Sequence, residues 1–468
     1  MMIRFRPLAA LALPGLLTAC AASLPPAPPL PAVSPAAWHS TLPPASAGAL
    51  ASWWEQQSEP LLPELIRAAQ EASPDLASAR ARIAQARAER VAAGAALAPS
   101  ASLDASATRT RGQNGAPHLS SGLAGLNLAW EIDLFGAGRA SRDAAQARLE
   151  LAEAQWHGSR VALAAETANA YEELRRCWQL QRVAEADAAS RAESARLTRL
   201  AAAAGLESPA NLAMAEASAA EGAGQARAQQ TQCAAGVQAL AALTAVEAAT
   251  LRARLQQAGL TQGALGGPQL GGIGLAALPA AVLAQRPDVY AAERAVAAAS
   301  ADAGAAVAAQ YPRLGLQGMV AVTRSRAGGV DTRGDTWSIG PLALSLPVFD
   351  GGTRYANEQA ARAAYAAAVS AYQATVRQAV REVEEALLQL DGTAARAADA
   401  QRALDGYQTA FRATEARYRS GMASLFELEQ ARRAQLGAET ALVNLQRERS
   451  AAWISLYRAA GGGWSRQP

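Results

Sequence analysis

The sequence predicts a mainly α-helical protein with β-hairpins, built from one unit that is written twice along the chain. Alternating apolar residues from Leu126 to Leu134 have the spacing of a strand. A Phe135-Gly-Ala-Gly turn follows, and from Arg139 a long Ala/Arg/Glu-rich run without proline has the spacing of a helix. A similar junction recurs at Phe349-Asp-Gly-Gly, about 214 positions later. The repeat indicates a duplicated protomer with long helices and strand hairpins.

The composition of the 468 residues favours long, closely packed helices over a bulky core. Hydrophobic residues make up 51%, but many of these are alanine, and aromatic residues make up only 5%. All 43 basic residues are arginine, and the net charge is +3. No run of basic and aromatic residues is present, so we expect no nucleic-acid partner.

The N-terminus has the pattern of a signal peptide over residues 1–19. Two arginines precede an apolar run that is too short to span a bilayer as a helix. The sequence Leu-Thr-Ala-Cys20 resembles a bacterial lipobox, which implies cleavage before Cys20, a lipid on its thiol and, with alanine after it, sorting to the outer membrane. Ordinary secretion with an incidental cysteine is the alternative. Residues 20–52 then form a lipidated cysteine and an extended Pro/Ala/Ser-rich tether.

The first repeat is expected over 53–262. It begins with a helix from Trp53 to Ala96, and strands at about 101–110 and 123–134 follow, joined by a polar loop. Their length suits tilted transmembrane strands, although a soluble hairpin with one wet face has the same pattern. A helical hairpin over 139–247 comes next, and its first arm is about 100 Å long.

Two cysteines lie symmetrically about the break in this helical hairpin. Cys177 lies 28 residues before Gly205, and Cys233 lies 28 residues after it. If the two helices fold back at Gly205, both cysteines lie at the same height. We predict that they form a disulfide, since such bonds persist in an oxidising compartment; two buried free thiols are the alternative.

A Gly-rich linker over 263–277 separates the halves, and the second repeat is expected over 278–464. Its elements are a helix from Leu278 to Gln310, strands at about 313–324 and 337–348 joined by a polar loop, and a helical hairpin over 353–457.

These elements predict a conduit rather than a catalyst. Four strands cannot close a barrel, and an open sheet edge is not tolerated in lipid, so several chains must share one barrel. The long helices must pack side by side as well. We find no nucleotide fingerprint, zinc spacing or nucleophile elbow, and therefore expect no enzyme, cofactor or metal site.

Several sequence motifs together make the chain similar to a known family, the TolC-like outer membrane factors, and in particular to their NodT-type lipoprotein branch. They are the Leu278-Pro…Gln-Arg286-Pro-Asp-Val stretch, the Trp130-Glu-Ile-Asp-Leu-Phe-Gly junction, two Gly-x-x-Ser helix breaks and the lipobox. The resemblance covers essentially the whole mature chain. It implies a homotrimer with a twelve-stranded β-barrel in the outer membrane and an α-helical tunnel across the periplasm. It also implies a periplasmic adaptor and an inner-membrane RND-type pump as partners.

The resemblance assigns roles to the two helix breaks. The tips that would dock the adaptor are Gly205, Leu206 and Ser208, and Gly421, Met422 and Ser424. Acidic residues past the second tip narrow the tunnel in the family. Glu427 matches the first such position, Gln430 stands at the second, and the neighbouring Glu429 is a candidate substitute for it. A ring of carboxylates would favour cations. Solvated helix surface is the alternative role for both glutamates.

The function implied is an outer-membrane exit duct of a tripartite RND-type efflux system, which conducts small molecules passively. Two alternatives are an outer-membrane channel for type I protein secretion and a structural periplasmic lipoprotein without a pore. The last should lack amphipathic strand hairpins, and this chain has two.

Overall fold

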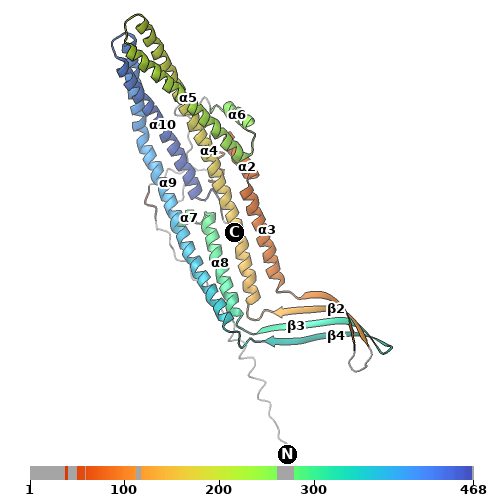
Figure 1. The fold of residues 1–468 in the computed structure, drawn as a ribbon. Helices are drawn as coiled ribbons and strands as arrows, with labels where there is room; N and C mark the ends of the chain where they lie inside the picture. Colours follow the sequence, from red (N-terminus) through yellow and green to blue (C-terminus); the bar gives the residue numbers. More distant parts are fainter. Residues whose placement is uncertain are drawn as a thin grey trace, which may run out of the picture. The chain divides into compact units, whose positions relative to one another are not determined.

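A computed structural model describes residues 37–40, 50–57, 59–111, 118–260, 273 and 279–465. Helices dominate, and four strands form one sheet (Figure 1). In chain order the elements are η1 (Leu50–Ser52), α2 (Leu61–Ala72), α3 (Pro74–Ala95), β1 (Ser100–Thr110), β2 (Leu119–Ile132), α4 (Ala137–Ala203), α5 (Pro209–Thr244), α6 (Ala248–Gln257), α7 (Pro279–Leu283), α8 (Pro287–Ala308), β3 (Arg313–Ala327), β4 (Val330–Ser345), α9 (Thr353–Arg419) and α10 (Leu425–Ala459).

The residues form two compact units, and each unit takes segments from both repeats. The described part of the first unit comprises Arg80–Ala154 and Tyr290–Ala374, and it contains the sheet. The second unit comprises Val33–Ala79, Gln155–Val289 and Thr375–Pro468, and it contains the two helix tips. The mainly α fold with β-hairpins is confirmed.

The sheet of the first unit is antiparallel, with the strand order β1-β2-β3-β4. The β2–β3 pairing joins the two repeats, since Leu119 lies opposite Ala327 and Ile132 lies opposite Leu314. At the end of each hairpin an aspartate caps the long helix that follows. Asp133 accepts hydrogen bonds from the backbone N–H groups of Gly138 and Arg139, and Asp350 accepts them from two residues of the second junction. Both copies of the junction therefore cap the helix with an aspartate, but Asp133 precedes Phe135 while Asp350 follows Phe349.

The second unit has a conventional apolar core around α2, α4 and α10. The rings of Trp53, Trp54 and Tyr457 pack together with centroids 4.4 to 5.3 Å apart, and only Trp53 and Tyr457 are stacked. Leu62 and Leu65 of α2 are fully buried. At its edge the Tyr171 hydroxyl donates to Glu59 at 2.8 Å, and Arg175 forms an ion pair with the same carboxylate. This core holds several helices together within one chain.

Two expected helices are each divided by a proline. The helix predicted from Trp53 to Ala96 is instead a turn followed by α2 and α3, with the break at Ser73 and Pro74. The helix predicted from Leu278 to Gln310 is α7 and α8, with the break before Pro287. Proline disfavours helical backbone in the residue before it, which explains both corrections.

The second strand hairpin has no long loop, contrary to our prediction of a polar loop between the strands at about 313–324 and 337–348. β3 and β4 stay paired up to Ala327 and Val330, and the turn between them consists of Gly328 and Gly329 alone. Both glycines have positive φ angles of 57° and 87°, as a two-residue hairpin turn requires. The polar residues of this segment therefore belong to the strands.

The short helix α6 was also not predicted.

Among the described residues, no single helix is long and apolar enough to cross a membrane. One pair, α5 with α6, passes by length and composition but is bent by 109°.

Candidate functional site

The sheet presents one strongly apolar face. Residues paired across an antiparallel sheet lie on the same face, and successive residues alternate between faces. The register of the four strands therefore brings a set of large apolar side chains together, and these are 37% to 81% exposed in the single chain. We call this set the apolar face: Leu103, Leu126, Leu128, Trp130, Val320, Trp337, Ile339, Leu342 and Leu344.

A bulge in β4 keeps this face continuous. Gly318 pairs with Ile339, but Leu316 pairs with Leu342, so β4 contains one extra residue between the two pairs. Gly340 takes a φ of 112° there. Without the extra residue, Leu342 and Leu344 would turn to the opposite face.

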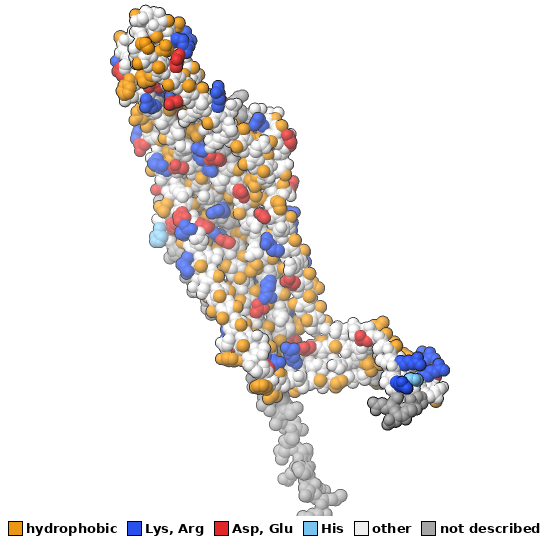
Figure 2. Space-filling model, viewed as in Figure 1, with side chains coloured by type: hydrophobic (Ala, Val, Ile, Leu, Met, Phe, Trp, Pro, Cys, Tyr) orange, Lys and Arg blue, Asp and Glu red, His pale blue; other side chains and the backbone are white. Residues whose placement is uncertain are grey.

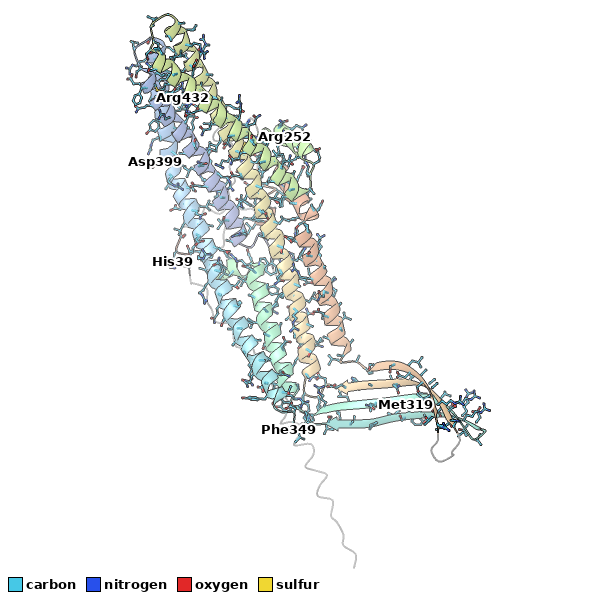
Figure 3. All side chains as sticks on the ribbon, viewed as in Figure 1. His39, Arg252, Met319, Phe349, Asp399 and Arg432 are labelled. Atoms are coloured by element: carbon cyan, nitrogen blue, oxygen red, sulfur yellow. A yellow bond between two sulfur atoms is a disulfide. The ribbon has the colours of Figure 1, made fainter. Side chains whose placement is uncertain are left out.

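The opposite face of the sheet is polar. Its side chains hydrogen-bond to one another across the strands: Asn127 donates to Asp104 at 2.6 Å, and the hydroxyls of Thr108 and Ser121 lie 2.6 Å apart. Met319, labelled in Figure 3, is among the few larger apolar residues on this side. A sheet with one apolar and one polar face, both exposed, can separate lipid from water.

The sheet also has two open edges. In the described part of the chain, β1 pairs only with β2, and β4 pairs only with β3. All residues of β1 are exposed, and almost all of β4. Each edge therefore carries unpaired backbone N–H and C=O groups that can accept a strand from another chain.

The second unit has two helix tips, one between α4 and α5 and one between α9 and α10 (Figure 1). The helices that enter the two tips have the same type of C-terminal cap. At the first tip, Leu206 N–H donates to Ala201 C=O at 2.9 Å, and Gly205 has a φ of 72°. At the second tip, Met422 N–H donates to Arg417 C=O at 2.8 Å, and Gly421 has a φ of 74°. Both are Schellman caps, which need glycine at the left-handed position.

The helices that leave the tips are capped by serine. The Ser208 hydroxyl accepts from Asn211 N–H at 3.1 Å, and the Ser424 hydroxyl accepts from Glu427 N–H at 3.2 Å. The apolar side chains of Leu206 and Met422 remain 81% and 66% exposed. The tips are thus rigid turns that present an uncovered apolar residue each.

Glu427 has a local structural role that we did not predict. Its carboxylate accepts the Ser424 backbone N–H at 2.7 Å, which completes a capping box at the start of α10. These hydrogen bonds, with Arg417 nearby, hold the pKa of the Glu427 carboxyl below its usual range. The Ser-x-x-Glu spacing was visible in the sequence. Its side chain is still about half exposed, and Gln430 is exposed as well.

Glu429, another residue of the predicted gate, is buried in the single chain. Glu429 is only 7% exposed and forms an ion pair with Arg432, which is labelled in Figure 3. Arg432 also donates to the hydroxyl of Ser194 at 2.8 Å, and the Ser218 hydroxyl donates to Glu429 at 3.3 Å. The carboxylate therefore serves a buried polar network that joins α4, α5 and α10.

Cys177 and Cys233 are joined by a disulfide in the structure, with their Cα atoms 5.5 Å apart. It links α4 to α5 within the core of the second unit. Cys20 lies outside the described residues. Among those described, no group of three or more His, Cys, Asp or Glu side chains could hold a metal ion.

The Arg-Pro-Asp stretch also lies in the second unit, and its arginine is buried. Arg286 is 5% exposed and forms ion pairs with Asp288 at 2.7 Å and with Glu382 at 2.8 Å. It also donates to the backbone carbonyl of Ala459 at 2.8 Å. This arginine therefore anchors the start of α8 to α9 and α10.

A family model described as outer membrane efflux protein matches residues 65–223 and 278–462, which together are well over half of the chain. The chain belongs to this family. The family consists of channel proteins, and its members are found in the outer membrane. The resemblance inferred from the sequence motifs is confirmed.

Individual relatives agree with the family match. Pyoverdine export outer membrane protein OpmQ of Pseudomonas putida is 30% identical over 467 residues, which cover 97% of each protein. Nodulation protein T of Rhizobium leguminosarum bv. viciae is 28% identical and covers 98% of this chain and 94% of its own length. Outer membrane protein OprJ of Pseudomonas aeruginosa is 38% identical, but the match covers only 40% of this chain and 39% of OprJ.

Solved structures share the fold. The outer-membrane channel OprN superimposes with a TM-score of 0.81 at 29% identity, over 93% of this chain and 98% of OprN. The outer membrane protein VceC of Vibrio cholerae gives a TM-score of 0.75 at 27% identity, over 88% and 99% of the two chains.

Proposed function

We propose that the chain is the outer-membrane exit duct of a tripartite RND-type efflux system and that it works as a homotrimer. The observation that carries this proposal is the open four-stranded sheet, with an exposed apolar face, a polar face and two unpaired edges. Three copies supply twelve strands, enough to close a barrel whose apolar face meets lipid and whose polar face lines the duct. Membership of the outer membrane efflux protein family supports the same function.

The partners in this proposal are a periplasmic adaptor and an inner-membrane pump that supplies the energy. The exposed Leu206 and Met422 side chains at the rigid tips are the contacts we propose for the adaptor. The lipid on Cys20 would anchor each copy in the outer membrane. The names of the relatives include pyoverdine, solvent and cation export, so they support small molecules as the cargo class without selecting one.

Glu427 is the proposed selectivity residue of the tunnel, because the other carboxylate at the predicted gate positions, Glu429, is buried. Three copies would place three half-exposed carboxylates near one another, and these repel one another and attract cations. Gln430 contributes hydrogen-bonding groups without charge.

Single-channel conductance of the lipidated full chain in a planar bilayer tests this function. We expect discrete steps of uniform size, and we expect Glu427→Ala to raise the conductance or weaken the preference for cations. Ser424→Ala is the matched control, because it removes the capping box but keeps the carboxylate. If wild type and Glu427→Ala are both silent, the duct is refuted; if Glu427→Ala conducts like wild type, only the gate role is lost.

A further inference from the structure

An arginine cluster lies at the turn end of the sheet, on the same face as the apolar side chains. The register places Arg324 opposite Arg333 and Arg326 opposite Asp331, while Arg109 pairs with Ser120, which in turn is opposite Arg326. All four arginines are exposed. We call this cluster the arginine rim: Arg109, Arg324, Arg326 and Arg333. Figure 2 shows basic side chains gathered at this end of the sheet.

The arginine rim lies just beyond one end of the apolar side of the sheet. Along β2, the apolar side of the sheet runs from Ile132 to Ala124, about 27 Å at ~3.4 Å per residue. This agrees with the ~25 Å height of the apolar band of an outer-membrane barrel. Two residues further on, opposite Gly122, the same face changes to arginine. The rim thus begins where the hydrocarbon of the bilayer would end and the lipid headgroups would begin.

The charge is confined to the lipid side. At the same height, the polar face carries hydroxyl residues, with Thr108 opposite Ser121 and Ser325 opposite Thr332. A cluster that steered cargo into the duct would lie on that face. The arginines instead face outward, towards whatever surrounds the barrel.

The rim has more positive than negative charge, because the same face carries four arginines and two aspartates, Asp331 and Asp335. Arg324 forms an ion pair with Asp331 at 2.5 Å. Within the described residues, Arg109, Arg326 and Arg333 have no carboxylate within ion-pair distance. Like charges directly opposite each other in a sheet, such as Arg324 and Arg333, are destabilising. An anion that bridges them would remove this cost, and guanidinium groups match phosphate oxygens in a two-pronged geometry.

We propose that the arginine rim binds the phosphate groups of an anionic glycolipid in the outer leaflet of the outer membrane. The inference rests on the proposed barrel, because that barrel turns the apolar face towards lipid. The strand ends next to α3, α4, α8 and α9 lie at the opposite end of the sheet from the hairpin turns. If the helices are periplasmic, the turn end and its rim are at the outer leaflet. Three copies would make the rim a ring around the barrel.

The test measures binding of diphosphoryl lipid A to the purified full-length protein in detergent, counted by native mass spectrometry. The variant Arg109→Gln/Arg326→Gln/Arg333→Gln should lose affinity on the order of tenfold or more. The triple Arg→Lys variant should bind more weakly than wild type but better than the Gln variant, because lysine keeps the charge and loses the two-pronged geometry. Arg252→Gln on the exposed surface of α6 is the control for a charge removed away from the rim. Asp331→Asn releases Arg324 and should bind more tightly.

Two further arms identify the ligand. Enzymatically dephosphorylated lipid A should bind the wild type weakly, and inorganic phosphate alone should not bind at millimolar concentration. The proposal is overturned if the Gln variant binds diphosphoryl lipid A like wild type, if dephosphorylated lipid binds equally well, or if free phosphate binds without any preference for lipid. Single-channel conductance separates the two proposals. Normal steps of the Gln variant with unchanged lipid binding refute the rim only, while silence of both wild type and Glu427→Ala refutes the duct.

Discussion

The sheet and the helical core of this chain bury their apolar residues to very different extents. Around Trp53 and Tyr457, side chains from several helices are almost completely buried within one chain. In the sheet, Trp337 and Ile339 are 74% and 81% exposed. The apolar residues of the helical core are covered within the chain, whereas those of the sheet are exposed, and we propose that lipid and two more copies cover them. Exposed apolar area on this scale marks an interface.

The largest effect should come from charge on the apolar face. We expect Ile339→Arg to abolish assembly in the outer membrane, because an arginine facing mid-bilayer costs about 2–4 kcal/mol in each copy. Ser338→Arg is the matched control, since Ser338 is the next residue and lies on the polar face. Membrane fractionation and native gels measure both. Equal tolerance of the two arginines would show that neither face meets lipid.

The second prediction concerns the self-contained helical core. Removing the disulfide with Cys177→Ser/Cys233→Ser should lower the free energy of unfolding of the helices by about 4 kcal/mol, because the bond closes a long loop between residues 56 positions apart. Denaturant unfolding followed by tryptophan fluorescence measures this. Alkylation of the denatured, unreduced protein provides the check: two labelled thiols would show that no bond exists.

A third prediction uses the buried Glu172 of α4. Burial raises its pKa to about 7, and this effect outweighs the hydrogen bond with Ser450 and the charge of Arg447, which both lower the pKa. The unfolded carboxyl loses its proton near its ordinary pKa, while the folded one keeps it. The contribution of Glu172 to the free energy of unfolding is therefore highest at acidic pH. It falls by about 3 kcal/mol as the pH rises to about 7.

Glu172→Gln should remove this slope and make the variant more stable than wild type at pH 8, with no difference at pH 4. Thermal unfolding across that range measures it. Glu166→Gln, an exposed residue on the same helix, is the control. Parallel pH profiles for wild type and Glu172→Gln would contradict the assignment.

The smallest effect is expected at the helix tips. The side chains there are exposed, but the backbone groups form hydrogen bonds within the tip itself. Ser424→Ala should weaken the first turn of α10 by about 1 kcal/mol, seen as faster amide exchange there. The low pKa of Glu427 means that the same cap also weakens as pH falls into the acidic range. Unchanged exchange in this turn at both pH values would show that the capping box adds nothing.

The local part of this architecture was accessible from the sequence, because strand alternation, glycine breaks and long helices are set by neighbouring residues. The breaks at Pro74 and Pro287 were missed although their cause is local. The burial of Glu429 was not predictable in the same way, since it depends on Arg432 and on serines of α4 more than 200 positions away. The β2–β3 register is similarly non-local, and the rim became visible only when that register aligned the arginines.

The central claim is that one chain supplies a third of a closed barrel. Native mass spectrometry of the full, lipidated chain released from lipid nanodiscs tests it most directly. We predict a single species with three copies, and Ile339→Arg should prevent its formation while Ser338→Arg should not. A membrane-inserted monomer or a closed species with a different number of copies would contradict the claim.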